Sequence, residues 1–138
     1  MNGNDFMSWI LRSPFHGMLS KGMMLITVIG HKTGKKYTTP VEYYDQGGYL
    51  WVITSRNRTW WRNLKGGAEV SLLIKRKAIF AFGEVVLDES EVEAQLREYV
   101  RRMPVSARGL GLLENNLPNE EAIKRVGKDR LFVRLALR

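Results

Sequence analysis

The chain has 138 residues, of which 44% are hydrophobic, and its 22 Lys and Arg outnumber its 14 Asp and Glu to give a formal net charge of +8. This length predicts one domain over residues 1–138. The lack of cysteine excludes disulfides and thiol nucleophiles, and because only two histidines are present as well, no metal site is expected. No apolar run reaches the ~18 residues of a membrane span and the N-terminus lacks the cationic start of a signal peptide, so we expect a cytoplasmic protein without a transmembrane segment.

Apolar spacing in the first half of the chain predicts a helix followed by strands. Residues 5–20 carry apolar side chains at helical spacing, with Ser13 capping a segment that restarts at Pro14. Three strands are then predicted over residues 23–29, 37–44 and 49–54. Because short turns join them, the three strands are predicted to form an antiparallel meander.

Strands and short helices are also predicted in the middle and at the end of the chain. Thr59 is placed to cap a short helix over residues 60–64, which Gly66 and Gly67 end. Further strands are predicted over residues 70–74, 79–87 and 131–135. Gly83 lies inside the second of these and predicts a bulge there.

Two helices are predicted between the last two strands. The first is capped by Asp88 or Ser90, runs to about Met103 and stops at Pro104. Its apolar face is formed by Val92, Leu96, Tyr99 and Val100. Residues 118–126 predict a second, shorter helix.

The number and spacing of the strands indicate a mainly β protein with helices, an α+β chain built on a small antiparallel barrel. The first three strands are too closely spaced for the helical crossovers that parallel strands require. A Rossmann fold is therefore excluded.

Residues 30–35, Gly-His-Lys-Thr-Gly-Lys, follow the first strand directly. Flexible glycines and lysines at the end of a strand present backbone N–H groups together with positive charge, which suits phosphate or another anion. The segment is not a Walker P-loop, because three residues separate the glycines, Lys36 replaces the Ser or Thr, and no helix follows. The alternative is an ordinary hairpin turn with solubilising lysines.

Residues 55–64 combine three arginines with two adjacent tryptophans. Such a segment could bind an aromatic anion by stacking and charge-assisted hydrogen bonds. Alternatively it is a helix that buries one Trp and exposes the other, or the stacking platform of a basic barrel that binds single-stranded nucleic acid. In a meander this segment and the turn at residues 30–35 lie at the same end, where one ligand could contact both.

Acid–base residues are sparse, and no Ser/His/Asp or paired-carboxylate arrangement can be assembled. His31 could bind phosphate or carry a proton, whereas His16 is expected to be structural. Tyr99 is expected in the core, with proton donation as the alternative. The catalytic residues stay unassigned.

The order of these segments resembles the deazaflavin (F420)-dependent nitroreductases and quinone reductases, relatives of the flavin-binding split β-barrel proteins. The resemblance extends over residues 22–74, and the final strand fits more loosely. The matching residues are Gly30-His31-Lys32-Thr33-Gly34, Pro40-Val41, Ser55-Arg56 and Trp60-Trp61-Arg62-Asn63-Leu64-Lys65.

This resemblance implies a split antiparallel β-barrel of the FMN-binding type that binds F420, with FMN as the alternative cofactor. The implied activity is hydride transfer from the reduced cofactor to a small-molecule acceptor such as a quinone or nitroaromatic; a non-catalytic carrier of the same fold is the alternative. A homodimer is expected, and nucleic acid is not. The implied cofactor-binding residues are His31, Lys32, Thr33, Gly34, Pro40, Val41, Ser55, Arg56, Trp60 and Asn63.

The chain also departs from the family pattern in three places. The loop from Arg56 to Trp60 is shorter than usual and lacks glycine and proline. His31 stands where arginine is common, and residues 104–113 lack the tyrosines that often lie near the substrate.

Overall fold

The structure is a computed structural model in which residues 22–138 are described. The helix predicted over residues 5–20 lies outside the described residues. Within residues 22–138, no helix is both long and apolar enough to cross a membrane.

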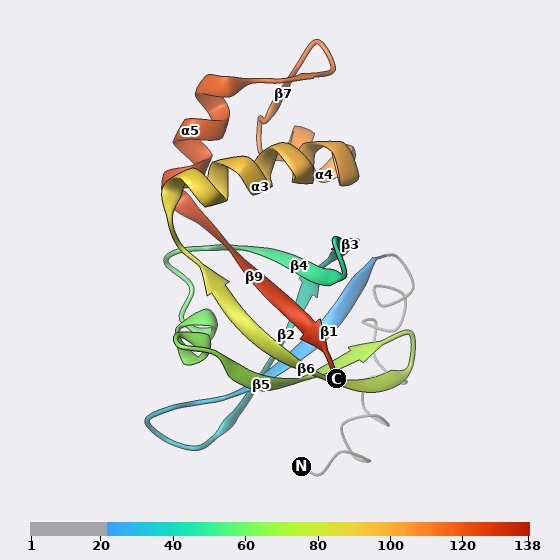
Figure 1. Ribbon diagram of the computed structural model, residues 1–138, viewed down its shortest axis with the longest axis vertical. Helices are drawn as coiled ribbons and strands as arrows, with labels where there is room; N and C mark the ends of the chain where they lie inside the picture. Colours follow the sequence, from blue (N-terminus) through green and yellow to red (C-terminus); the bar gives the residue numbers. More distant parts are fainter. Residues whose placement is uncertain (1–21) are drawn as a thin grey trace.

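An antiparallel sheet curls into a half barrel that forms the body of the molecule (Figure 1). Its strands are β1 (Met23–Ile29), β2 (Lys36–Glu42), β3 (Tyr44–Gln46), β4 (Tyr49–Ser55), β5 (Ala68–Ile74), β6 (Lys77–Val86) and β9 (Arg130–Leu137). They are ordered β2-β1-β5-β6-β9-β4-β3, which confirms the predicted antiparallel split-barrel fold.

Helices and one small hairpin complete the fold. They are η1 (Trp60–Leu64), α3 (Glu89–Arg102), α4 (Pro104–Gly109), α5 (Glu120–Asp129) and the hairpin β7 (Leu113–Glu114) and β8 (Leu117–Pro118). The three α-helices gather at one end of the sheet, while η1 lies beside the turn between β1 and β2 (Figure 1).

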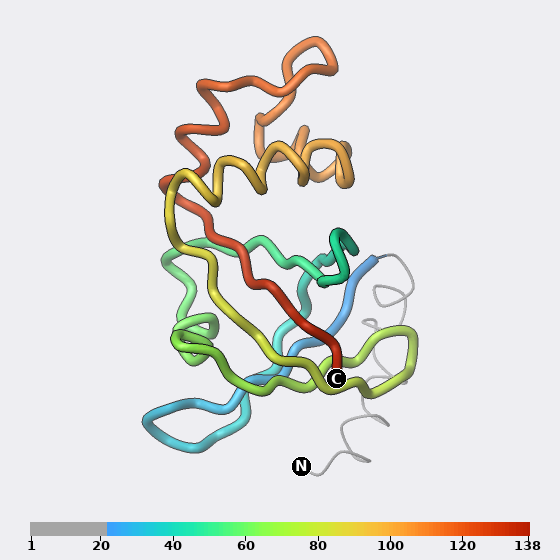
Figure 2. The backbone as a smooth tube through the Cα atoms, viewed as in Figure 1, coloured from blue at the N-terminus to red at the C-terminus, as the bar shows by residue number. Residues whose placement is uncertain are grey.

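The predicted three-stranded meander is wrong. The predicted strand at residues 37–44 divides into β2 and β3, which lie at opposite edges of the sheet. Between them, the Tyr43 N–H donates to the Gly22 carbonyl at 3.1 Å. Strand β4 pairs with β9 from Leu50↔Leu135 to Ser55↔Arg130, and Figure 2 shows β9 running between β4 and β6. A pairing between such distant segments leaves no local signal in the sequence.

The predicted bulge at Gly83 is also wrong. The register of β6 continues without a break through Ala68↔Gly83 and Gly83↔Leu135. A Cβ atom on Gly83 would lie 3.3 Å from the side chains of Leu135 and Leu64, so the glycine permits close packing of β6 instead.

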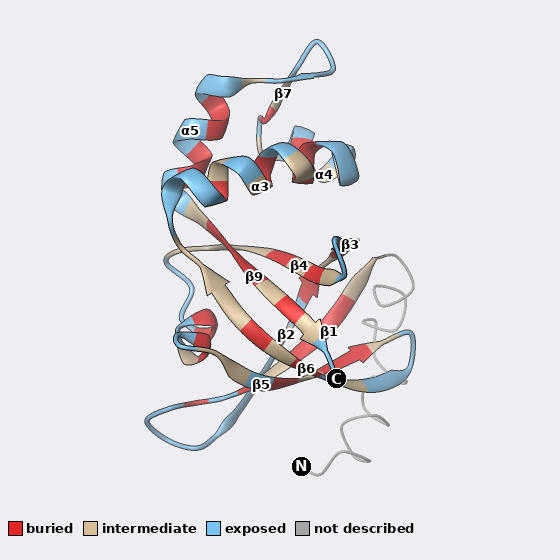
Figure 3. Ribbon diagram, viewed as in Figure 1, coloured by how far each residue is buried: buried red, intermediate tan, exposed pale blue. Residues whose placement is uncertain are grey.

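Two hydrophobic clusters fill the two faces of the sheet (Figure 3). One lies inside the half barrel and includes both adjacent tryptophans. The other lies between the outer face and the helices, where the predicted face of α3 packs around Phe132. In β9 the alternating residues Leu131 and Val133 belong to the first cluster and Phe132 to the second, so this strand is buried on both faces.

The N-terminal boundaries of α3 and α5 follow their capping side chains, whereas Thr59, the predicted cap of η1, makes no capping hydrogen bond. Asp88 caps α3 by accepting from the Glu91 N–H at 3.1 Å, and Pro104 both follows this helix and begins α4. The helix predicted from residue 118 begins later, because Asn119 accepts from the Ala122 N–H at 3.2 Å and Pro118 lies in β8.

Candidate functional site

The turn at residues 30–35, here called the glycine-lysine turn, folds back on itself between β1 and β2. The Gly30 N–H donates to the Lys35 carbonyl at 2.8 Å, and the Gly34 N–H donates to the Gly30 carbonyl at 2.9 Å. Gly34 has φ of +69°, in the region that favours glycine. Thr33 Oγ1 accepts from the Lys35 N–H at 3.2 Å. The turn is therefore held together by hydrogen bonds among its own residues.

This turn contacts η1, as expected of two basic segments at one end of the molecule. The His31 N–H donates to Asn63 Oδ1 at 3.1 Å, and Asn63 Nδ2 donates to the Trp60 carbonyl at 3.2 Å. Asn63 therefore links the two segments. His31 and Lys32 are exposed at the tip of the turn.

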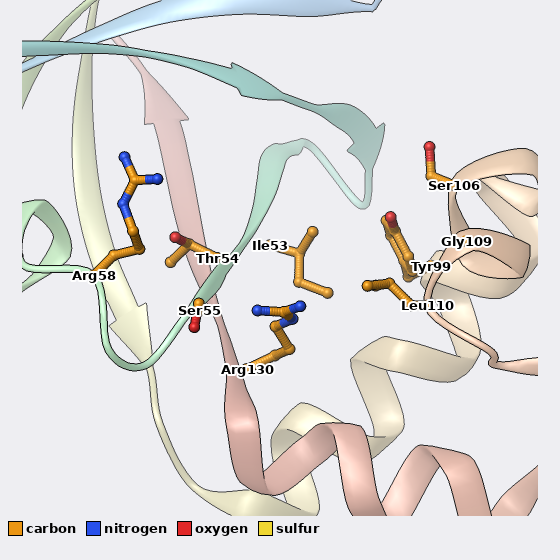
Figure 4. Close-up of a pocket in the computed structure, with 9 residues that line it drawn as sticks. All are labelled: Ile53, Thr54, Ser55, Arg58, Tyr99, Ser106, Gly109, Leu110 and Arg130. Carbon is orange, nitrogen blue, oxygen red and sulfur yellow. The ribbon is translucent and has the colours of Figure 1, made fainter.

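A pocket of about 450 Å³ lies between the end of β4 and the helices α3 and α4 (Figure 4). Its lining residues are Ile53, Thr54, Ser55, Arg58, Tyr99, Ser106, Gly109, Leu110 and Arg130. Two of them are arginines and none carries a carboxylate. In Figure 4 Arg58 lies at one end of the pocket, while Arg130 extends between Ser55 and the helical wall. The charge of this lining favours anions and electron-rich oxygens.

Arg58 connects the pocket to the inner side of β2. Its Nη2 atom lies 3.5 Å from Thr39 Oγ1, at the limit of a hydrogen bond. From Thr39, strand β2 leads back to the glycine-lysine turn, which contacts η1.

Glu42 lies behind the helical wall of the pocket, at the end of β2. Its Oε2 atom accepts from Ser106 Oγ at 2.7 Å, and its Oε1 atom accepts a long hydrogen bond from the Tyr99 hydroxyl at 3.4 Å. Burial, reinforced by the nearby Glu42 charge, raises the pKa of Tyr99 to about 12. Tyr99 therefore stays a neutral phenol, able to donate a hydrogen bond.

We expect this raised pKa to make stability fall at alkaline pH. Tyr99 ionises at its usual value of 10.0 in the unfolded chain and at about 12 in the folded chain, so its contribution is complete below pH 10.0 and is lost as pH rises through the folded pKa. The melting temperature of the wild-type protein should therefore fall more steeply across this range than that of Tyr99→Phe. Equal slopes in thermal melts monitored by circular dichroism would contradict the prediction.

Arg56 follows the last residue of β4 and braces three backbone segments. Its Nε atom donates to the Arg130 carbonyl at 2.9 Å, and its Nη2 atom donates to the Leu87 carbonyl at 2.9 Å and the Gly127 carbonyl at 3.1 Å. The Arg56 N–H also donates to the Asp129 carbonyl at 2.9 Å. The guanidinium thus ties the end of β4 to α5, to the start of β9 and to the residue that follows β6. Its contact with the cofactor stays a prediction.

The structure brings only part of the predicted site together. Of those ten residues, Ser55 alone lines the pocket, whereas His31 and Asn63 join the turn to η1. Val41 and Trp60 lie in the core, with 8% and 7% of their surface exposed. Their side chains pack in the hydrophobic cluster inside the half barrel.

The neighbouring Trp61 is only 5% exposed, so the expectation that one Trp is exposed is wrong. Pro40 is exposed on the edge strand β2, where its missing N–H breaks no ladder hydrogen bond. Sequence reasoning missed Arg130 as a site residue, because a cation just after a helix is typical of a solvated surface. Ser106 and Leu110 also line the pocket, but no motif or spacing in the sequence indicated that they would.

Comparisons with known proteins agree with this fold. A sequence model of the F420H(2)-dependent quinone reductase family matches residues 13–109. A solved F420-H2 dependent reductase (FDR-A) is 18% identical, with 83% of this chain and 94% of that chain covered and a TM-score of 0.54. A conserved hypothetical protein from Mycobacterium tuberculosis is 15% identical, with 100% and 81% covered and a TM-score of 0.56.

A structure described as a domain-swapped dimer is also similar in fold, at 18% identity, 83% and 80% coverage and a TM-score of 0.53. No curated protein matches the chain.

Proposed function

Because the chain belongs to the F420H(2)-dependent quinone reductase family, we propose that it transfers hydride from reduced F420 to a quinone or another electron-poor acceptor. Family membership makes the protein an oxidoreductase with F420 as its cofactor. The observation that carries the proposal is the pocket with two arginines and no carboxylate, connected through β2 to the glycine-lysine turn.

The chemistry of these residues fits a flat ring with a phosphate-bearing tail. The lysines of the turn suit phosphate, and Ile53 and Leu110 offer apolar contacts beside the polar groups of the pocket. We assign His31, Lys32, Thr33 and Gly34, together with Ser55, to the phosphate side. Pro40 and Val41 would shape the wall beside the ring, and Trp60 and Asn63 would brace it.

When bound, F420H2 supplies the hydride and both of its electrons. The chain's own residues bind and orient the cofactor, and they exclude water from it. Tyr99 and Ser106 keep neutral hydroxyl groups at the helical wall, where Glu42 orients them. Leu110 and Ile53 give the same space an apolar surface.

The buried tryptophans disfavour the nucleic-acid-binding alternative. A stacking platform needs exposed ring faces, but Trp60 and Trp61 are only 7% and 5% exposed. A carrier of the same fold would bind F420 without turnover. A homodimer stays a prediction, which sedimentation of the purified protein can check.

Binding of F420 should depend on Lys32. Replacing Lys32 with Ala removes one positive charge from the exposed tip of the turn, so we expect F420 to bind about fivefold to tenfold more weakly, or about 1 to 1.4 kcal/mol. Quenching of F420 fluorescence measures the dissociation constant. Lys75→Ala, in the exposed turn between β5 and β6, is the matched control and should bind like the wild type.

The same titration separates the alternatives. Parallel titrations with FMN and single-stranded DNA at two salt concentrations identify the ligand class, and failure of both F420 and FMN to bind would refute the proposed function. Mixing the complex of protein and reduced F420 with menadione then distinguishes an enzyme from a carrier. An enzyme oxidises F420H2 rapidly, so the absorbance of the cofactor changes, whereas a carrier leaves the absorbance unchanged.

A further inference from the structure

Arg130 is a cation in the pocket whose guanidinium has no hydrogen-bond or ion-pair partner within residues 22–138. It is half-buried at the junction of α5 and β9 and lines the pocket from the side of the sheet. Its side chain makes no hydrogen bond or ion pair with any residue that the structure describes. A partly desolvated guanidinium without a partner gains most from a ligand that supplies an acceptor oxygen.

The backbone that carries this side chain is fixed. Arg130 pairs with Ser55 in the ladder between β9 and β4, and its carbonyl accepts from Arg56 Nε at 2.9 Å. The preceding Asp129 carbonyl accepts from the Arg56 N–H at 2.9 Å. The fixed backbone sets the point from which the Arg130 side chain enters the pocket, as recognition of a ligand requires.

Around Arg130 the pocket offers an apolar surface with neutral polar groups. Ile53 and Leu110 provide the apolar contacts, while Tyr99 and Ser106 carry hydroxyls on the opposite wall (Figure 4). Arg58 lies at the other end of the pocket, beside β2. The two arginines can therefore serve different ligands, Arg58 the cofactor and Arg130 a second molecule.

We propose that Arg130 binds the electron acceptor, a planar quinone, by donating hydrogen bonds to the oxygen on which negative charge develops. This inference rests on the proposed function. The quinone gains a hydride with both electrons and one proton from solvent to become the hydroquinone, while F420H2 is oxidised to F420. Arg130 stabilises the oxyanion that exists after hydride transfer and before protonation, which is when a fixed cation is most effective.

The test compares two naphthoquinones of similar shape on wild-type protein, Arg130→Met and Arg130→Lys. One probe is 2-hydroxy-1,4-naphthoquinone, which is an anion at neutral pH, and the other is neutral menadione. Calorimetric titration of the protein, with and without oxidised F420, should show about tenfold tighter binding of the anion to the wild type. Arg130→Met should lose this preference, and Arg130→Lys should keep part of it.

Activity and folding give two further readouts. The kcat/KM for menadione should fall about tenfold in Arg130→Met, whereas the dissociation constant of F420 should stay within about twofold. Arg125→Met, an exposed arginine on α5 outside the pocket, is the control for loss of one charge from this part of the chain. Its melting temperature and that of Arg130→Met should match the wild type.

The inference is overturned if Arg130→Met binds F420 normally and keeps both the wild-type preference for the anionic naphthoquinone and its kcat/KM. Failure of the wild type to bind F420 would instead remove the proposed function. In that case the naphthoquinone titration without F420 still decides whether Arg130 recognises a quinone oxygen, because it does not depend on turnover.

Discussion

Arg56→Gln is expected to lower the free energy of unfolding by about 2 to 4 kcal/mol, because three backbone carbonyls lose a charged donor. The carbonyls belong to Leu87, Gly127 and Arg130, which lie on separate segments, so no single replacement donor can reach them all. Glutamine is shorter and neutral. Urea denaturation followed by circular dichroism measures the loss.

Two further variants distinguish a brace from a cofactor ligand. Arg56→Lys keeps the charge but not the planar fork, so we expect most of the stability loss to remain. Arg62→Gln removes an exposed arginine whose guanidinium carbon lies 5.6 Å from the centroid of the Trp61 ring, and should cost less than about 1 kcal/mol. An unchanged urea midpoint in Arg56→Gln together with much weaker F420 binding would show that Arg56 binds the cofactor instead.

Local patterns predicted the elements that are stabilised by neighbours in sequence. The β1–β2 hairpin and α3 follow from apolar runs, short turns and a capping side chain, all of which operate within a few residues. Gly66 and Gly67 likewise mark the end of η1. The order of strands could not be predicted in this way, because β4 pairs with β9, a strand far away in the sequence, around a shared core.

The turn and the pocket differ in how far their geometry follows from local sequence. The glycine-lysine turn is one continuous segment, so its geometry depends on residues that are neighbours in the sequence. The pocket instead combines Ser55 on β4, Tyr99 on α3, Ser106 on α4 and Arg130 on β9. No spacing in the sequence relates these four residues, and Arg130 in particular becomes a site residue only through the pairing of β9 with Ser55.

The adjacent glycines after η1 give the second large effect. Both have positive φ, +81° for Gly66 and +90° for Gly67, yet only at Gly67 would a Cβ atom overlap the Phe82 ring, where Cε1 would lie 2.9 Å away. Gly66→Ala should therefore cost about 1 kcal/mol from backbone strain alone. Gly67→Ala adds steric overlap and should cost about 2 to 4 kcal/mol in urea denaturation.

Phe82 has little freedom to move away, because the Arg138 guanidinium lies over its ring at 5.2 Å and Glu69 pairs with it across the sheet. Displacement of the chain at Gly67 would be transmitted to η1, since the Gly67 N–H donates to the Leu64 carbonyl at 2.9 Å. As η1 carries Asn63, the residue that holds the His31 N–H, F420 should also bind more weakly to Gly67→Ala than to Gly66→Ala. Equal stability and equal F420 affinity of the two variants would show that the close approach of Gly67 to Phe82 does not position the cofactor site.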